Sequence, residues 1–163
     1  MTLDRTDMRI LRQLEQDGRI SNQDLANAVA LSPSACLRRV KLLEARGVID
    51  GYRCAISPKN VGVAFEALVY VSMRPEVPEW HEKFVEAIRE WPEVVSAQVV
   101  TGASNYVLVV RTRDLDHYSD FVMHKLHRAS GVMSINSSVV LSTLKRDGSI
   151  LDLVAPSAGG HGG

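Results

Sequence analysis

Basic side chains gather in residues 32–46 of the chain. The stretch holds four cations against the single acid Glu44, and they are Arg38, Arg39, Lys41 and Arg46. A cationic patch gains affinity for a nucleic acid by releasing condensed counterions, and a guanidinium group can also donate two hydrogen bonds to guanine O6 and N7. The charge run therefore predicts a surface for double-stranded DNA. The charges alone leave open a plain solvated helix face as the alternative.

Helical spacing decides which of these side chains can act together. Ser34, Arg38 and Lys41 follow one another at i, i+4 and i+7, so on a helix they project from one face. Ser32 can accept backbone N–H bonds as the N-cap, and a small residue at position 34 lets the helix start approach base edges closely. The residues expected at DNA are Ser32, Ser34, Arg38, Arg39 and Lys41.

Three helices are expected to position this face within residues 1–50. An apolar stripe from Leu3 to Leu14 predicts a first helix that ends near Asp17-Gly18. Ser21, followed by Asp24 three residues later, resembles a capping box that opens a short second helix. The third helix begins at Pro33 and stops at Gly47, and its apolar Leu37, Val40 and Leu43 are predicted to face the other helices. Two short helices joined by so tight a turn form a helix-turn-helix pattern, and residues 48–56 alternate enough to predict a strand, either a wing or a link to the next domain.

The rest of the chain alternates strands and helices. Strands are expected over residues 65–74, 94–100, 106–112 and 132–144, with helices over 78–91 and 114–129. This βαββαβ order is the ferredoxin-like split βαβ unit, with both helices on one side of an antiparallel sheet. Apolar residues fall on both faces of the strands, so the open face predicts self-pairing in a dimer. The predicted fold class is α+β, with an N-terminal helix-turn-helix (winged-helix-like) domain and a C-terminal ferredoxin-like domain.

Composition supports this division of the chain. Residues 1–60 carry ten basic and seven acidic side chains, whereas residues 61–163 carry nine and twelve. We predict a helix-turn-helix domain over 1–50, a linking strand or hinge over 51–62, a ferredoxin-like domain over 63–152 and a glycine-rich flexible tail over 153–163. The apolar runs are far shorter than the roughly 20 residues of a membrane-spanning helix, and the N-terminus lacks a hydrophobic leader, which favours a cytoplasmic protein with no membrane partner.

Metal and enzyme chemistry find little support. Four residues, His117, Asp120, His124 and His127, share one helix face, but successive turns spread them over more length than one ion spans, so no metal site and no cofactor are predicted. The two cysteines form no Cys-x-x-Cys unit, and Cys36 is expected as a packed core thiol. The chain also lacks phosphate-loop, dinucleotide and hydrolase signatures, which argues against an enzyme.

Several stretches together resemble the Lrp/AsnC (leucine-responsive, feast/famine) family of transcriptional regulators over about residues 3–152. They are residues 3–11 (LDRTDMRIL), 31–40 (LSPSACLRRV), 43–52 (LEARGVIDGY) and 100–106 (VTGASNY). The resemblance implies a DNA-binding domain, a linking strand, and a regulatory domain that dimerises, often into octamers, and binds a small amino acid between subunits.

The resemblance also implies effector-site residues. They are Gly102, Ala103, Ser104, Asn105 and Tyr106 in one loop, and Ser137 on the final strand. The family loop commonly ends Asp-Tyr, and a companion threonine position corresponds to Ile135. An ammonium group prefers a carboxylate partner, so Asn105 predicts weakened binding or a shifted preference. An alternative hypothesis is that the protein is an oligomeric module that senses an amino acid and acts through protein partners rather than DNA.

Overall fold

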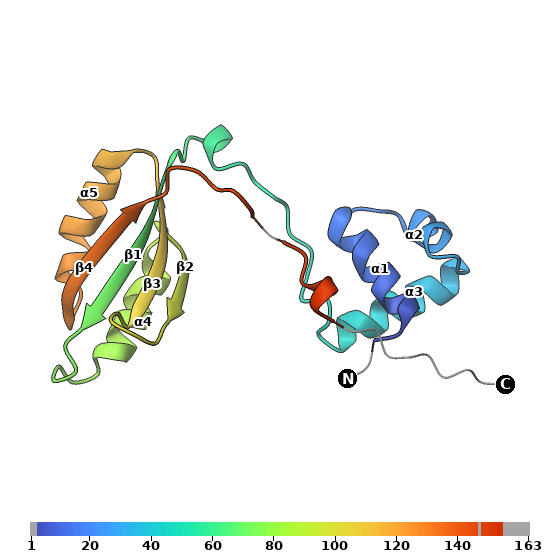
Figure 1. Cartoon of the computed structure of the whole chain (residues 1–163), viewed down its shortest axis with the longest axis horizontal. Coiled ribbons are helices and arrows are strands. Elements are labelled where there is room, and N and C mark those ends of the chain that lie inside the picture. Colours follow the sequence, from blue (N-terminus) through green and yellow to red (C-terminus); the bar gives the residue numbers. More distant parts are fainter. Residues whose placement is uncertain (1–2, 147, 155–163) are drawn as a thin grey trace. The chain divides into compact units, whose positions relative to one another are not determined.

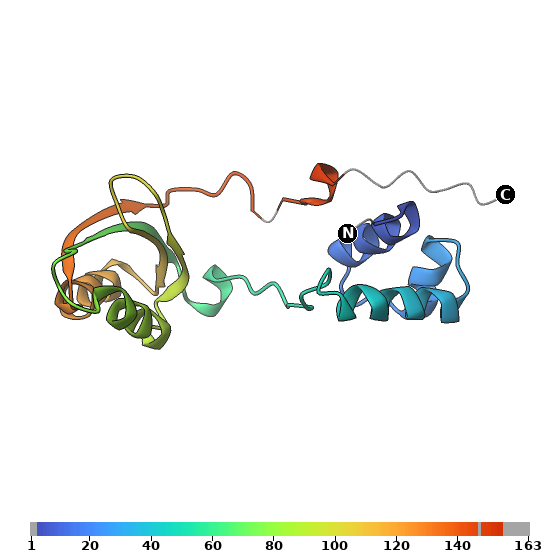
Figure 2. The same cartoon turned by 90° about the horizontal axis from the view of Figure 1, so that it is seen from below.

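The computed structural model describes residues 3–146 and 148–154 and divides into two compact units (Figures 1 and 2). One unit comprises the described residues up to Ala55 together with those from Lys145 on, and the other comprises Ile56–Leu144. The unit boundary therefore falls inside the predicted linking segment 51–62. The described residues from Lys145 to Asp152, which the sequence placed with the second domain, group with the first unit. Most of the predicted tail lies outside the described residues.

Three helices build the first unit, each with a side-chain cap. Helix α1 (Arg5–Gln16) begins after Asp4, which accepts the N–H of Asp7 at 2.7 Å in a reciprocal capping box. Helix α2 (Asn22–Ala28) begins after Ser21, which accepts the N–H of Asp24 at 3.1 Å. Helix α3 (Pro33–Ala45) begins after Ser32, as predicted. These caps satisfy backbone donors that a helix start otherwise leaves without a partner.

The core of this unit confirms most of the predicted inward face of α3 but not all of it. Cys36 and Leu43 are buried against residues of α1 and α2, such as Ile10 and Ala26. Leu37, however, is 44% exposed, so its predicted inward direction is wrong. The reason is its place on the helix: Leu37 comes one residue after Cys36, about 100° round the helix, so it projects away from the buried face that Cys36 and Leu43 share.

The strand predicted over residues 48–56 is also wrong. The structure assigns no strand to these residues. Val48 and Ile49 instead pack against the helical core, and Tyr52 donates a hydrogen bond from its hydroxyl to Glu44 at 3.0 Å. A strand requires a neighbouring backbone for its hydrogen bonds, and here the apolar side chains are used to cover helices.

The end of the described chain belongs to this same helical core. A short 3₁₀ helix, Leu151–Leu153, lies against α1, where Leu151 packs on the core and Asp152 accepts from Arg12 at 3.0 Å. The first unit therefore combines residues near both ends of the described chain.

The second unit has the predicted βαββαβ order. Its elements are β1 (Phe65–Met73), α4 (Trp80–Glu90), β2 (Val94–Val99), β3 (Tyr106–Thr112), α5 (Leu115–His124) and β4 (Val132–Val139). Short 3₁₀ turns cover Lys59–Val61 and Leu126–Arg128. The antiparallel sheet has the order β2-β3-β1-β4. Strand β4 ends at Val139, before the predicted residue 144: its last pair with β1 is Val139 opposite Ala67, and beyond it Val140 donates one more backbone bond to the carbonyl of Glu66 at 2.9 Å.

Both helices lie on one face of this sheet (Figure 2). Alternate residues of β1, including Val69 and Val71, are fully buried there against Phe84 of α4 and Phe121 of α5. The opposite face carries half-buried side chains such as Leu68, Tyr70 and Val109, together with an ion pair between Glu66 and Arg111. One layer of helices thus covers one layer of sheet, and the second sheet face has an apolar centre.

Candidate nucleic-acid interface and effector loop

The start of α3 is held in place by its neighbour α2. The Asn22 side chain donates to the carbonyl of Pro33 at 2.9 Å, and the N–H of Leu31 donates to the carbonyl of Ala26 at 2.9 Å. Ala30 adopts a left-handed backbone, with φ of 55°, which lets the chain reverse within a few residues. The turn between the two helices is therefore fixed by hydrogen bonds at both ends.

The outward face of α3 carries the predicted patch. Ser34, Arg38 and Lys41 are all exposed, and their spacing puts them on adjacent turns of one helix face. Within residues 3–146 and 148–154, neither Arg38 nor Lys41 makes an ion pair or a side-chain hydrogen bond. Ser32 is occupied as the N-cap, with its hydroxyl 3.3 Å from both the Ala35 N–H and the Ser34 hydroxyl. Two cations of this face are thus available to an anion outside the chain.

Arg39 is placed differently from Arg38. Its Nη1 lies 2.7 Å from Asp4 and 2.7 Å from Asp7, and its side chain is 33% exposed. The hydrogen bonds that Arg39 donates to the Asp4 and Asp7 carboxylates raise the pKa of Arg39. Burial opposes ionisation of Asp4, but the Asp7 N–H and the Arg39 guanidinium outweigh it and lower the pKa of that carboxyl. Arg39 therefore joins the start of α1 to the middle of α3.

The second predicted site, residues 102–106, is anchored to the end of β1. The N–H of Asn105 donates to the carbonyl of Val71 at 2.9 Å, and the Asn105 side-chain oxygen accepts the N–H of Met73 at 2.8 Å. The Ser72 hydroxyl donates to the carbonyl of Ala103 at 3.1 Å. Gly102 adopts a φ of 116°, which side chains with a Cβ rarely take. The loop is thus pinned by backbone bonds, and the oxygen of Asn105 is already used within the chain.

The remaining two predicted effector residues have partners of their own. Tyr106 is 2% exposed, its ring packs near Phe84, and its hydroxyl lies 2.5 Å from Nδ1 of His81. Burial, with a smaller effect of Glu82, raises the pKa of Tyr106. Ser137, on β4, pairs with Val69 of β1, and its hydroxyl accepts a hydrogen bond from the Tyr118 hydroxyl at 2.5 Å. Residues 102–105 therefore lie in the loop and Tyr106 begins β3, while Ser137 lies on β4, in contact with α5.

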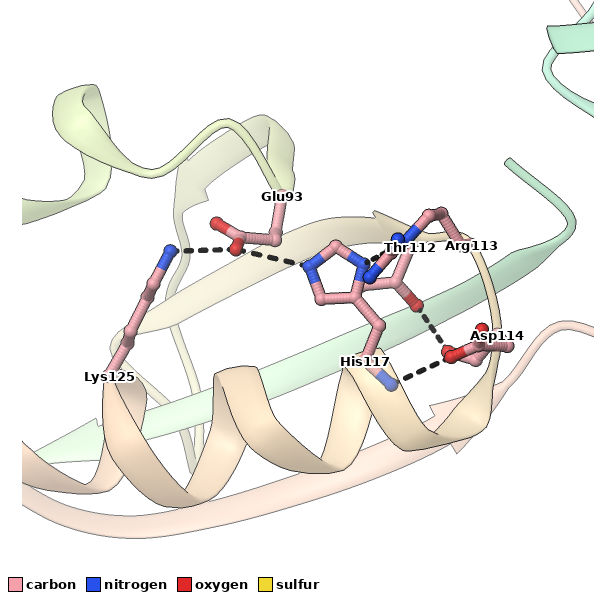
Figure 3. Close-up of polar contacts among 6 residues, drawn as sticks. All are labelled: Glu93, Thr112, Arg113, Asp114, His117 and Lys125. Carbon is pink, nitrogen blue, oxygen red and sulfur yellow. Dashed lines mark hydrogen bonds and ion pairs between the residues drawn. The ribbon is translucent and has the colours of Figure 1, made fainter. Parts of the chain in front are cut away.

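Sequence reasoning missed a polar cluster between β2 and α5 (Figure 3). Glu93 has a side chain that is 7% exposed, and its Oε1 lies 2.7 Å from Nζ of Lys125 and 3.4 Å from Nε2 of His117. Arg113 donates from Nε to the other ring nitrogen of His117 at 3.4 Å. Burial opposes ionisation of Glu93, but the Lys125 hydrogen bond outweighs it and lowers the pKa of that carboxyl.

The cluster bears on the histidine face that the sequence raised as a metal candidate. His117 is directed at Glu93, and Nε2 of His124 lies 4.0 Å from Asp120. In the described part of the chain, no three His, Cys, Asp or Glu residues are arranged to hold a metal ion. The position of Glu93, before β2, carries no periodic signal that could have linked it to α5.

These observations define a class of protein: a helix-turn-helix unit with exposed cations on its third helix, joined in one chain to a ferredoxin-like α/β unit. Residues 3–50 match the winged helix-turn-helix DNA-binding family, and residues 66–150 match the Lrp/AsnC ligand binding domain. The chain belongs to the Lrp/AsnC family of transcriptional regulators, and its relatives are not enzymes.

Named relatives are similar to this chain over nearly its whole length. The transcriptional regulator AzlB of Bacillus subtilis is 34% identical over 148 residues, which is 91% of this chain and 94% of that protein. The leucine-responsive regulatory protein of Escherichia coli K12 is 34% identical over 88% of each chain. A solved structure of a transcriptional regulator from Neisseria meningitidis in complex with L-Met has a TM-score of 0.86 and 40% identity, covering 89% of this chain and 94% of that one.

The family membership gives each unit its general role. The first unit is a DNA-binding domain and the second is an amino-acid-binding regulatory domain. Among the described residues, no helix is both long and apolar enough to cross a membrane.

Proposed function

We propose that α3 reads double-stranded DNA through Ser34, Arg38 and Lys41, with Ser32 at the helix start. The observation that carries the proposal is the pair of exposed cations, Arg38 and Lys41. They lie on one face of a helix whose N-terminus is fixed by a hydrogen-bonded turn. Such a helix end can enter the major groove, where a guanidinium recognises guanine. Arg39, which the sequence grouped with these residues, is bound to Asp4 and Asp7, and we assign it the role of orienting α3.

A salt titration of binding tests this proposal. Full-length protein is mixed with fragmented genomic DNA, and bound fragments are recovered and their affinities measured across salt concentrations. We expect preferred fragments and a steep loss of affinity with salt, because cations on the protein displace counterions from phosphates. Arg38→Ala should weaken binding, whereas the control Arg89→Ala, which changes an exposed arginine on α4, should not. Absence of any DNA binding would contradict the proposal and favour the module that acts through protein partners.

We infer that the effector is a small amino acid that binds at residues 102–106, with Ser137 contributed across an assembly of subunits. Support comes from the exposed residues Gly102 and Ala103 in a loop pinned to β1, and from the solved structure of a relative in complex with L-Met. Because the Asn105 oxygen is bonded to Met73, this side chain offers amide N–H donors, which suit a carboxylate rather than an ammonium group.

Thermal unfolding in the presence of each of the twenty amino acids tests the effector. A ligand at 100 times its dissociation constant stabilises by about 2.7 kcal/mol. If no amino acid raises the melting temperature, the effector proposal fails while the DNA proposal stands. Effector and DNA binding, where linked, must change each other's affinity by the same factor.

We propose that the chain forms a homodimer through the open sheet face and assembles further into an octamer. The half-buried apolar side chains on that face, such as Leu68, Tyr70 and Val109, would be covered by the same face of a second copy. In such a dimer two copies of α3 would contact half-sites about one helical turn, roughly 34 Å, apart. Light scattering of the full-length protein measures the mass of this assembly.

We place the protein in the cytoplasm, because a DNA-binding regulator of this kind acts at the chromosome.

A further inference from the structure

Leu37 occupies the middle of the face that carries Arg38 and Lys41. It lies three residues after Ser34 and four before Lys41, so these side chains are neighbours on adjacent turns of α3. Leu37 is 44% exposed although it sits among polar and charged groups, whereas Cys36 beside it in sequence is fully buried. The surface of α3 that holds the free cations therefore also holds a large apolar side chain.

An apolar side chain on this face meets a specific requirement when the helix enters DNA. If Arg38 and Lys41 reach into the major groove, Leu37 enters with them and loses its water. The edges of the bases present hydrogen-bond donors and acceptors there, and the only apolar group among them is the C5 methyl of thymine. Leu37 placed against any other base edge would strip water from a polar group without replacing its hydrogen bond.

We propose that Leu37 is a specificity-determining residue, which contacts a thymine methyl group in each half-site. This inference rests on the proposed function, because it requires α3 to lie in the groove. The place of Leu37 in the first half of α3 supports it, because the N-terminal residues of a reading helix are the ones that contact base edges.

Leu42 provides a matched comparison on the same helix. It is 46% exposed, nearly the same as Leu37, but it lies in the last turn of α3, beside Ala45. Leu42 comes five residues after Leu37, which is about 140° round the helix, so the two leucines project from different faces. Leu42 therefore should not distinguish thymine from a base that lacks the methyl group.

Uracil substitution in DNA isolates the methyl group. Full-length protein first enriches duplexes from a random pool, and each thymine of the best duplex is then replaced singly by uracil, which keeps base pairing and removes only the methyl. The affinity of wild type, Leu37→Ala and Leu42→Ala for every duplex is measured by gel shift at one salt concentration. All three proteins are tested against the same duplex, the one that the wild type enriched from the random pool, and against its uracil derivatives.

We expect wild type to lose affinity about fourfold at one thymine of each half-site, the factor that corresponds to burial of one methyl group. Leu37→Ala should bind the thymine and uracil forms of that duplex equally, while Leu42→Ala should keep the fourfold difference. The inference is overturned if no uracil replacement weakens the wild type, or if Leu37→Ala keeps the same ratio. If no duplex is enriched at all, the proposed DNA reading itself fails, and this inference fails with it.

Discussion

Removing the ammonium group of Lys125 should destabilise the second unit through the carboxylate it leaves behind. In Lys125→Met the chain length of the side chain is kept, but Glu93 stays 93% buried and loses its 2.7 Å partner. A hydrogen bond to a charged group contributes about 1.5–3 kcal/mol. Lys125 itself is 42% exposed, so solvent replaces part of this contribution, and we expect a loss of about 2 kcal/mol.

Thermal unfolding followed by circular dichroism measures this loss. For a unit of this size, about 2 kcal/mol corresponds to a melting temperature lower by roughly 8–16 °C. Lys83→Met is the matched control, because Lys83 pairs with Glu79 at 3.3 Å on the surface of the same unit, with both side chains more than half exposed. Exposed pairs of this kind contribute about 0.5 kcal/mol or less.

The pH dependence supplies a second, independent readout. The pKa of Glu93 in the folded protein lies below its ordinary value of 4.5, so this group stabilises the fold above that pH and stops doing so as the pH falls through the folded value. In Lys125→Met the hydrogen bond that lowers the pKa of Glu93 is lost while burial still raises it, so the pKa of Glu93 should rise. The difference in stability between variant and wild type should therefore shrink as the pH falls from the raised pKa of Glu93 in the variant to its lowered pKa in the wild type.

Two results would refute this reasoning. One is a Lys125→Met melting temperature at pH 7 no lower than that of Lys83→Met. The other is a stability difference that stays constant from pH 7 to pH 3, because a loss of packing alone would not depend on the protonation of Glu93. A double variant, Glu93→Met with Lys125→Met, should recover part of the loss, since no buried charge remains.

Three further predictions concern the other surfaces. Arg39→Met should lower the free energy of unfolding of the first unit by about 1 kcal/mol in a urea titration, because two carboxylates lose their shared partner. Arg38→Met should leave that free energy unchanged and reduce DNA affinity. The opposite pattern would mean that Arg38 orients α3 and Arg39 contacts DNA. Leu151→Ala should cost the first unit about 1 kcal/mol of packing in the same urea titration, and Leu153→Ala, which changes a residue 85% exposed, should cost almost nothing; equal effects would mean that the C-terminal turn is not part of the core. Tyr70→Glu should convert the proposed dimer to monomers in light scattering with an unchanged circular dichroism spectrum, and an unchanged mass would exclude the open sheet face as the interface.

Patterns local in sequence were enough to predict the architecture. Helix starts at Ser21 and Ser32 depend on side chains that bond to backbone groups within three residues, so they can be recognised without a partner elsewhere. The βαββαβ order followed in the same way from apolar periodicity and turn residues. The length of β4 and the missing strand after Gly47 could not be predicted, because a strand exists only where another backbone is available to pair.

The site residues also divide into those that local sequence predicts and those that depend on distant partners. The common face of Ser34, Arg38 and Lys41 follows from helix geometry alone, and all three are exposed in the structure. Arg39 has the same charge and is adjacent in sequence, but its partners Asp4 and Asp7 are more than 30 residues away. The Asn105 side chain is likewise committed by a backbone group 32 residues away. Neither assignment has a signal in the local sequence.

The sequence by itself determined where the helices and the four strands of the sheet begin, because these starts depend on neighbours within one or two turns of chain. It also showed which part of the chain carries the excess of cations and which family the chain resembles. Tertiary structure decided which charges are free and which are paired, that Leu37 faces outward, and that Leu151 returns to pack with the first helix. These outcomes depend on groups brought together from distant positions, where distance and burial, rather than residue type, set the strength of an interaction.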